Sequence, residues 1–259
     1  MQKKLLGVFA AISCLLLLAA PAKALPVVDL DLGARYWGPS PSGDLGYVGD
    51  SLDLEDNLDF DREWEPYFFA RFSIPTVIID AHYTSLGYSG ESDVFPDTDF
   101  GDDIDLSQYT TISAEADLDV LHAGAMFSPP LTVPFMDLDL GIGAGAHYLE
   151  AKASIEAQNG AAEEDSASAR AVVPVAKGYF SASPPTVDLH LTLAGEGIAY
   201  SGHSFYDLRA TVDYRFRGLL IGDLALEAGY RTLGVDYDSD DLVLDTSFSG
   251  PFAGLKLAF

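Results

Sequence analysis

Apolar residues recur at every second position in one segment after another of this 259-residue chain. The clearest case is Leu138–Tyr148, and the segments 28–36, 208–216 and 224–231 repeat the pattern. A period of two is typical of a β-strand with one apolar and one polar face. After the N-terminal leader the sequence has no run of about 18 apolar residues, which a transmembrane helix would need. The alternation therefore predicts an all-β fold.

Residues 1–24 are expected to form a cleaved signal peptide rather than part of the fold. Two lysines precede the apolar stretch Leu5–Ala20, and Ala22-Lys23-Ala24 supplies the small residues of a cleavage site. The single cysteine, Cys14, lies inside this leader, so the mature chain would contain no thiol for disulfides or metal binding. Residues 25–259 are expected to form one domain with long acidic extracellular loops.

A soluble β-sandwich and a membrane β-barrel both alternate in this way, and three features favour the barrel. The polar face is rich in glycine and isolated charges, as a crowded lumen would be. The alternating runs reach the ~9–11 residues that a tilted strand needs to cross a bilayer. Aromatic residues gather at segment ends, as interfacial girdles do: Tyr36, Trp37, Trp64, Tyr148, Tyr214 and Phe216. The sequence predicts a transmembrane antiparallel up-and-down β-barrel.

About ten strands are predicted, with eight as the alternative. In order they are 27–37, 64–73, 76–88, 110–127, 136–152, 171–180, 186–200, 205–217, 222–236 and 241–259. Short or proline-containing turns alternate with the long acidic segments 38–63, 89–109 and 153–170. Outer-membrane barrels show this asymmetry, with the short turns in the periplasm. An even strand count then places both termini on the periplasmic side.

The formal net charge of −26 at pH 7 argues against nucleic acid or an anionic surface as a partner. It suits a barrel whose apolar band contacts outer-membrane lipid, the expected partner, while loops and lumen hold the charge. A small solute is a second candidate partner, and no cofactor is expected. Loop aspartates offer oxygen ligands for divalent ions, although solvated loops that repel one another explain them more simply: Asp97, Asp99, Asp102, Asp103, Asp105, Asp236, Asp238, Asp240 and Asp241.

The last segment has the most specific motif. Leu255, Leu257 and Phe259 share one face, while Gly254 and Lys256 share the other. This arrangement resembles the C-terminal β-signal of bacterial outer-membrane proteins, with Gly254 at its glycine and Leu257 and Phe259 at its apolar or aromatic positions. The resemblance implies recognition by the barrel-assembly machinery.

Two details of this segment depart from a simple pattern. Phe252 stands where the β-signal usually has a polar residue. Upstream, Leu242, Leu244 and Phe248 occupy even positions, whereas the C-terminal apolar face is odd. A bulge is therefore predicted at Gly250-Pro251.

The mature chain as a whole resembles small outer-membrane β-barrel proteins of proteobacteria, including the OmpW-like barrels. Its acidic segment Ser51–Leu58 resembles the loop that follows the first strand in that group. The resemblance implies the fold and a location in the outer membrane of a Gram-negative bacterium. It implies no substrate.

Two strands share the pattern Asp-x-His-x-Thr: Asp80, His82 and Thr84, and Asp188, His190 and Thr192. Alternation puts each set on one face, expected to line the lumen. Asp–His pairs can relay protons, hold a metal or activate water, so an outer-membrane enzyme is one hypothesis. However, residues two apart on a strand are about 7 Å apart, and a hydrogen-bonded lumen wall explains the rows more simply. No catalytic residue and no metal ligand are assigned.

Acidic pairs form a second candidate site near the predicted periplasmic ends: Asp29 and Asp31, and Asp137 and Asp139, with Asp117 and Asp119 as a third pair. Carboxylate rings select cations, so these pairs are candidates for a cation-preferring vestibule. Pairing with basic lumen residues explains them as well. His122 falls on the lipid face if the register of Leu118 and Val120 continues, so either the strand bulges near Leu121 or the histidine lies at the periplasmic interface.

The leading functional hypothesis is a structural barrel or a narrow conduit for small solutes. The alternatives are an enzyme that uses the Asp/His rows and an adhesin that binds through its loops.

Overall fold

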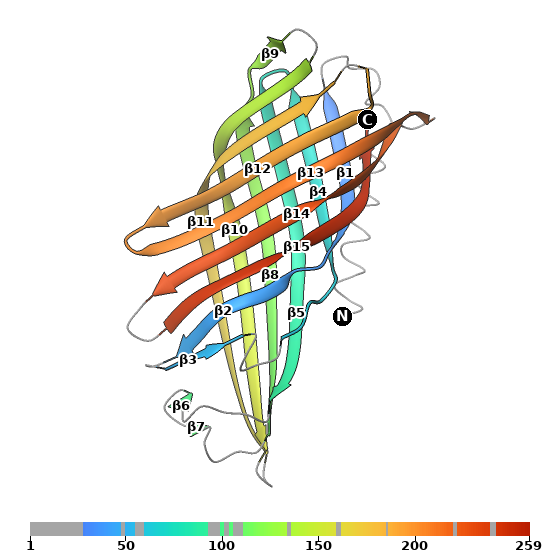
Figure 1. The fold of residues 1–259 in the computed structure, drawn as a ribbon. Coiled ribbons are helices and arrows are strands. Elements are labelled where there is room, and N and C mark those ends of the chain that lie inside the picture. Colours follow the sequence, from blue (N-terminus) through green and yellow to red (C-terminus); the bar gives the residue numbers. More distant parts are fainter. Residues whose placement is uncertain are drawn as a thin grey trace.

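The computed structural model describes residues 28–47, 50–54, 60–92, 99–100, 104–105, 111–133, 136–158, 162–184, 186–219, 222–238 and 242–259 (Figure 1). All helical or strand structure in these ranges is β-strand. Within them no helix is long and apolar enough to span a bilayer. The expected signal peptide, residues 55–58 of the acidic first loop, and Asp97, Asp102, Asp103, Asp240 and Asp241 lie outside the described residues.

Ten strands form a closed antiparallel barrel. Their order around the ring is β1 (Asp29–Trp37), β4 (Glu65–Ile74), β5 (Val77–Ser92), β8 (Thr111–Phe127), β10 (Met136–Gln158), β11 (Ala162–Ser183), β12 (Leu189–Tyr200), β13 (His203–Leu219), β14 (Gly222–Asp238) and β15 (Leu242–Ala258). β15 pairs with β1 and closes the ring. The predicted barrel of ten strands is confirmed, and the sandwich and the eight-strand alternative are excluded.

β2 (Ser40–Tyr47) extends the first barrel strand into the segment predicted to be a loop. Trp37 pairs with Phe252 and Ser40 with Ser249, so β1 and β2 follow β15 in one register across Gly38-Pro39. A side chain on Gly250 would overlap the carbonyl of Gly38, which explains the glycine at this close approach.

Minor strands add to the ring without changing it. β3 (Asp50–Asp53) pairs with β2, and β9 (Pro130–Val133) pairs with β10. β6 (Asp99–Phe100) and β7 (Ile104–Asp105) form a separate two-stranded sheet.

The bulge predicted at Gly250-Pro251 is wrong. β15 pairs with β14 in an unbroken register from Ala258 to Val243. Phe248 and Phe252 are both buried inside the barrel, and the Phe252 ring centroid lies 4.8 Å from the guanidinium carbon of Arg35. Apolar residues fill part of the lumen at this level, so the apolar pattern changes face although the backbone does not.

The C-terminal residue takes part in barrel closure. The Phe259 amide donates to the Leu30 carbonyl (2.9 Å), and the Leu30 amide donates to the Phe259 carbonyl (3.3 Å). A side chain on Gly254 would overlap the Ala34 carbonyl on the neighbouring strand. The β-signal positions therefore lie on the seam that converts a sheet into a barrel.

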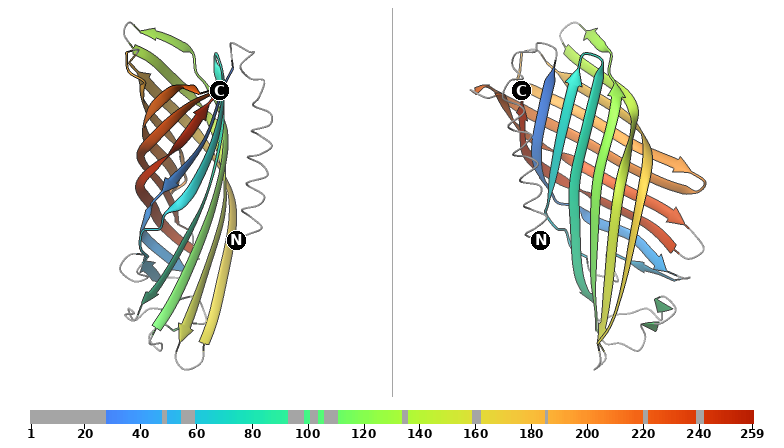
Figure 2. Two further views of the ribbon diagram at one scale, coloured as in Figure 1. Left: turned by 90° about the vertical axis from the view of Figure 1, so that its right-hand side faces the viewer. Right: turned by 180° about the vertical axis from the view of Figure 1, so that it is seen from behind.

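The two ends of the barrel differ. We call the end that holds the β4–β5 turn and the C-terminus the short-turn end, and the opposite end the long-loop end. β5, β8, β10 and β11 rise further toward the long-loop end than the other strands and form a tall wall (Figure 2). On the opposite side the chain turns tightly at Ser201-Gly202, where both residues have positive φ (54° and 89°), as a type I′ hairpin requires.

The outer face of the barrel is largely apolar. Exposed side chains include Ile79, Phe127, Ile142, Val172, Leu193, Leu208, Leu226 and Leu255. Their inward neighbours on the same strands are mostly polar residues, glycine or alanine, so the alternation follows the pattern of a barrel that faces lipid. Above this band the tall wall becomes polar outside, where Asp119 accepts a hydrogen bond from Tyr83 (2.8 Å) and Glu150 accepts one from Arg170 (3.2 Å).

Candidate metal centre

Three histidines form a row across adjacent strands inside the barrel. His82 on β5 pairs in register with His122 on β8, which pairs with His147 on β10. Because side chains on paired positions point to the same face, the three rings stack into the lumen. The ring centroids of His122 lie 4.6 Å from His82 and 4.5 Å from His147. All three side chains are buried.

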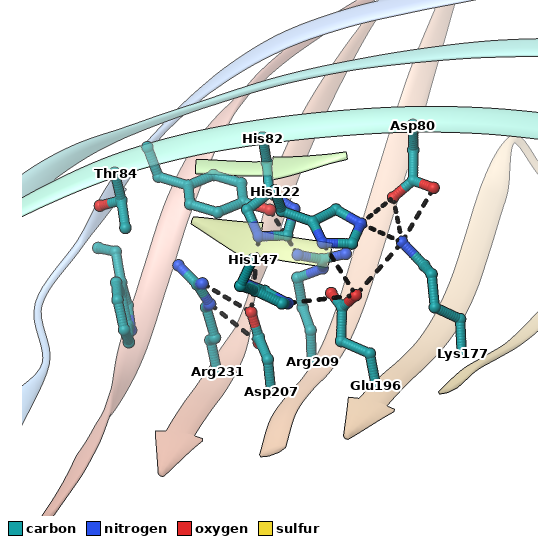
Figure 3. Close-up of polar contacts among 12 residues, drawn as sticks. Asp80, His82, Thr84, His122, His147, Lys177, Glu196, Asp207, Arg209 and Arg231 are labelled. Carbon is teal, nitrogen blue, oxygen red and sulfur yellow. Dashed lines mark hydrogen bonds and ion pairs between the residues drawn. The ribbon is translucent and has the colours of Figure 1, made fainter. Parts of the chain in front are cut away.

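A glutamate on the far side of the tall wall completes the cluster. Glu196 extends inward from β12, and its Oε2 atom lies 3.3 Å from His122 Nδ1 and 3.4 Å from His147 Nε2 (Figure 3). One ligand atom from each of the four residues falls within 4.8 Å of the others. We refer to His82, His122, His147 and Glu196 as the His3Glu cluster.

The facing atoms of this cluster lack hydrogen bonds. Within the described part of the chain, no partner in hydrogen-bond geometry reaches His82 Nε2, His122 Nδ1, His147 Nε2 or Glu196 Oε2. A buried polar atom left without a hydrogen bond costs about 1–3 kcal/mol. Such atoms on four neighbouring residues, whose ligand atoms lie within 4.8 Å of one another, form an arrangement that a bound cation would satisfy.

The donor set fits a transition metal ion of the zinc class. Zinc in proteins takes four ligands in a tetrahedron, with nitrogen or carboxylate oxygen at about 2.0–2.2 Å, which puts neighbouring ligand atoms ~3.3 Å apart. The two contacts of Glu196 already have this separation. Imidazole with one carboxylate also suits iron, cobalt and nickel, whereas magnesium and calcium prefer oxygen alone.

An ion pair supports the cluster on the β13–β14 side. Asp207 Oδ2 lies 3.6 Å from His82 Nε2, and Arg231 holds both carboxylate oxygens of Asp207 (3.0 and 2.7 Å). Arg209 donates to the Tyr67 hydroxyl (2.5 Å), and the Tyr67 ring stands beside His82 at 5.3 Å between centroids. Asp207 faces the same His82 Nε2 atom that a metal would take, so its carboxylate adds negative charge beside the site.

Glycines beside the row make space for these side chains. Gly124 and Gly145 pair with each other one inward position from the histidines. A Cβ on Gly145 would lie 2.6 Å from His122 Cε1, and a Cβ on Gly124 would lie 2.8 Å from Lys177 Cδ. The glycines on these two strands therefore leave the lumen volume that His122 and Lys177 occupy.

The cluster lies between two layers of different character. Toward the long-loop end Thr84 follows His82, and beside and beyond it lie buried apolar residues that we call the apolar layer: Leu86, Val120, Phe205, Leu233 and Phe248. Toward the short-turn end Glu227 binds Arg35 (2.8 Å) and Lys256 (3.4 Å), and Lys256 also binds Asp213 (3.0 Å). Water reaching the cluster from the long-loop end would have to cross packed hydrocarbon.

His82 of the first Asp-x-His-x-Thr row belongs to the His3Glu cluster, whereas the second row lies elsewhere on the barrel wall. Asp80, His82 and Thr84 are buried, with Asp80 bound to Lys177 and Thr84 donating to the Pro66 carbonyl (3.2 Å). His190 and Thr192 are half-buried on β12, where Thr192 donates to Ser181 (3.4 Å), and the Asp188 carbonyl accepts from the Arg215 amide. Three strands lie between β5 and β12, so the two rows form no joint site.

The acidic pairs also separate. Asp29, Asp137 and Asp139 are exposed at the short-turn end, and Asp31 pairs in register with Arg71. Asp117 and Asp119 do not belong there, because they stand on the outer face of the tall wall. A cation vestibule at Asp29, Asp31, Asp137 and Asp139 stays a prediction.

The placement of His122 on the lipid face is wrong, because its side chain is fully buried in the lumen. Leu118 and Val120 share its inward face and belong to the apolar filling of the upper barrel, not to the lipid band. Glu196, Lys177 and His147 were not singled out as functional. A histidine at an inward position on each of three consecutive strands was the available signal, once their register was known.

The fold and site define a closed barrel with a cluster of potential metal-ligand residues in its lumen. No protein-family model matches the chain, and no curated protein matches it. Several solved outer-membrane barrels are similar to it at low identity. Ail, the attachment invasion locus protein of Yersinia pestis, is 9% identical over 89% of this chain and 99% of its own, with a TM-score of 0.35.

Two further structures are similar at the same level. The outer membrane protease OmpT of Escherichia coli is 10% identical over 90% of this chain and 97% of its own (TM-score 0.47). The toluene transporter TodX of Pseudomonas putida is 11% identical over 90% and 89% (TM-score 0.29). The names of these proteins indicate different roles, and the likeness concerns the fold alone.

Proposed function

We propose that this protein is an outer-membrane β-barrel that binds one divalent transition metal ion, of the zinc class, at the His3Glu cluster. The observation that carries the proposal is the convergence of four buried ligand atoms without hydrogen bonds: His82 Nε2, His122 Nδ1, His147 Nε2 and Glu196 Oε2. Four protein ligands leave no open position for a substrate, which is typical of structural rather than catalytic zinc. The ion would tie the tall wall to β12.

The cellular location belongs to the same proposal. The apolar outer face supports contact with lipid, and the asymmetry of turns and loops supports a short-turn end in the periplasm. The affiliation with OmpW-like barrels and recognition of Gly254, Leu257 and Phe259 by the assembly machinery are also parts of it. A cleaved leader over residues 1–24 would deliver the chain to the periplasm.

Metal titration of the purified barrel in detergent tests the proposal. We expect one Zn²⁺ per chain by calorimetry, and Co²⁺ to give the intense visible absorption of a tetrahedral site. His147→Ala should abolish both signals. His203→Ala is the matched control, because His203 stacks on Tyr237 at the start of β13, away from the cluster.

Two results would contradict the proposal. One is the absence of stoichiometric binding to the wild-type barrel. The other is an equal loss of binding in His203→Ala and His147→Ala, which would point to nonspecific surface binding.

A narrow conduit for small cations is the second candidate function, favoured by the exposed aspartates at the short-turn end. Asp29, Asp137 and Asp139 leave their carboxylates near the barrel mouth. Planar-bilayer recordings decide this case. Cation-selective conductance that falls on Asp137→Asn and Asp139→Asn substitution would support the conduit, and silent bilayers would refute it.

A further inference from the structure

We propose that the ammonium group of Lys177 occupies part of the His3Glu cluster when no metal is bound, and that the incoming ion displaces it toward Asp80. The inference rests on the proposed metal binding and concerns its regulation. Lys177 would then be an internal competitor that sets how tightly the barrel holds its ion.

The contacts of Lys177 place it on two of the four ligand residues. Its Nζ atom lies 2.5 Å from His122 Nε2 and 3.3 Å from Glu196 Oε2 (Figure 3). Glu196 Oε2 is the same atom that faces His122 Nδ1 and His147 Nε2. Lys177 is buried, so water does not screen its charge. One carboxylate oxygen therefore serves the lysine in this structure and would serve the metal in the bound state.

A second cation at this oxygen is strongly disfavoured by electrostatics. An ammonium and a dication a few ångströms apart repel each other, and the repulsion is larger inside a barrel than in water. Binding of the ion therefore requires that Lys177 withdraw from Glu196.

The structure provides the position to which Lys177 can withdraw. Its Nζ already binds both carboxylate oxygens of Asp80, at 3.0 and 2.8 Å. Asp80 pairs in register with Gly124, so no side chain stands between the lysine stem and the Asp80 carboxylate on β8. A Cβ at position 124 would lie 3.0 Å from Nζ. Lys177 can therefore keep its charge paired while it leaves the ligands.

A purely structural role for Lys177 predicts the opposite change in metal affinity when the lysine is removed. If Lys177 only held the ligands in place, its removal would loosen the cluster and weaken metal binding. If it competes with the metal, its removal frees Glu196 Oε2 and leaves one more uncompensated negative charge nearby. Metal affinity should then increase.

The experiment compares Zn²⁺ and Co²⁺ affinity of the full barrel, wild type and Lys177→Met, by calorimetry and Co²⁺ absorption. We expect the variant to bind at least about tenfold more tightly, as removal of a buried like charge implies. Lys256→Met is the matched control, because Lys256 is a buried lysine bound to Asp213 and Glu227 in the layer toward the short-turn end. Its metal affinity should equal that of the wild type.

Two Asp80 variants keep the test valid if Lys177→Met folds poorly. Asp80→Asn removes the carboxylate to which Lys177 would withdraw, so the ammonium stays paired with Glu196. Metal affinity should then fall about tenfold. The double variant Asp80→Asn/Lys177→Met removes one negative and one positive charge together. It should bind more tightly than Asp80→Asn.

The outcomes separate the inference from the proposed function. Wild-type binding with equal or weaker binding by Lys177→Met overturns the inference and leaves the metal site intact. Binding by Lys177→Met alone supports competition by the lysine, while the absence of wild-type binding contradicts the proposed function. No binding by any variant overturns both.

Discussion

Glu196 Oε2 lies 3.3 Å from His122 Nδ1, although β10 and β11 separate their strands around the ring. Only barrel curvature brings the two side chains together, because neighbours three strands apart in a flat sheet would be about 14 Å apart. The contact depends on closure of the whole barrel. A metal held there would cross-link strands that share no hydrogen bonds.

Replacement of the Glu196 carboxylate tests whether this residue ties β12 to the histidines through a metal ion. Glu196→Gln removes the only charged ligand, so metal affinity should fall by more than the ~10–100-fold that follows loss of an outer-shell partner. Zinc calorimetry measures it. Glu227→Gln is the control, since Glu227 binds Arg35 and Lys256 instead, and an equal loss in that variant would show that the effect is general.

Acid should release the ion. Three imidazoles must be neutral to bind, so protons compete with the metal as the pH falls. The dissociation constant for the ion is therefore expected to rise as the pH is lowered. Co²⁺ titrations between pH 8 and pH 4 measure it, and a dissociation constant that does not change over this range would contradict histidine ligation.

The glycines beside the row give a steric prediction. A methyl group on Gly145 would lie 2.6 Å from His122 Cε1 and 2.9 Å from the Ala123 carbonyl, so Gly145→Ala should displace His122. We expect a loss of ~1–3 kcal/mol in unfolding free energy together with weaker metal binding. Gly178→Ala is the control, because the atom nearest to its new methyl lies 4.0 Å away. Urea unfolding in lipid vesicles should separate the two variants, and equal stability would refute the steric account.

The buried pair Asp207–Arg231 should contribute to stability only as a pair. Asp207→Asn leaves the Arg231 guanidinium, 1% exposed, without its bidentate partner, which costs about 3–5 kcal/mol. Asp207→Leu/Arg231→Met removes both charges and should recover most of the loss. A double variant no more stable than Asp207→Asn would contradict this account.

Barrel closure predicts a role for the last residue. Deletion of Phe259 removes two backbone hydrogen bonds to Leu30, so the barrel should fold more slowly into lipid vesicles and unfold at lower urea. Heat-modifiable mobility on gels measures the folded fraction. Folding indistinguishable from the wild type would show that the seam does not need this residue.

The alternation of residues predicted the strands because a lipid-facing barrel forces one face of each strand to be apolar. The period was less informative in the part of the tall wall whose outer face is polar. There the lumen is apolar and the outside is polar, as at Val120 and Asp119, so face assignments from hydrophobicity were inverted. The same inversion produced the bulge predicted near Phe248 and placed His122 on the wrong face.

The candidate site could not be derived from spacing along the chain. His82, His122 and His147 are about 40 and 25 residues apart, and only the register of β5, β8 and β10 aligns them. Glu196 joins them through barrel curvature, which no local pattern encodes. The Asp-x-His-x-Thr repeat did point to His82 and Asp80, but it suggested the wrong partner, since His190 lies on another part of the wall.

The apolar layer of Leu86, Val120, Phe205, Leu233 and Phe248 would impose a direction on metal exchange. An ion that leaves the cluster toward the long-loop end would have to enter packed hydrocarbon, whereas toward the short-turn end it meets successive carboxylates at Asp207, Glu227 and Asp213. With the short-turn end in the periplasm, the barrel would equilibrate with the periplasmic metal pool and stay insulated from the medium outside the cell. The fraction of barrels that hold an ion would then follow the metal concentration of the periplasm alone. Slow dissociation through a packed interior would make this fraction respond slowly when that concentration changes.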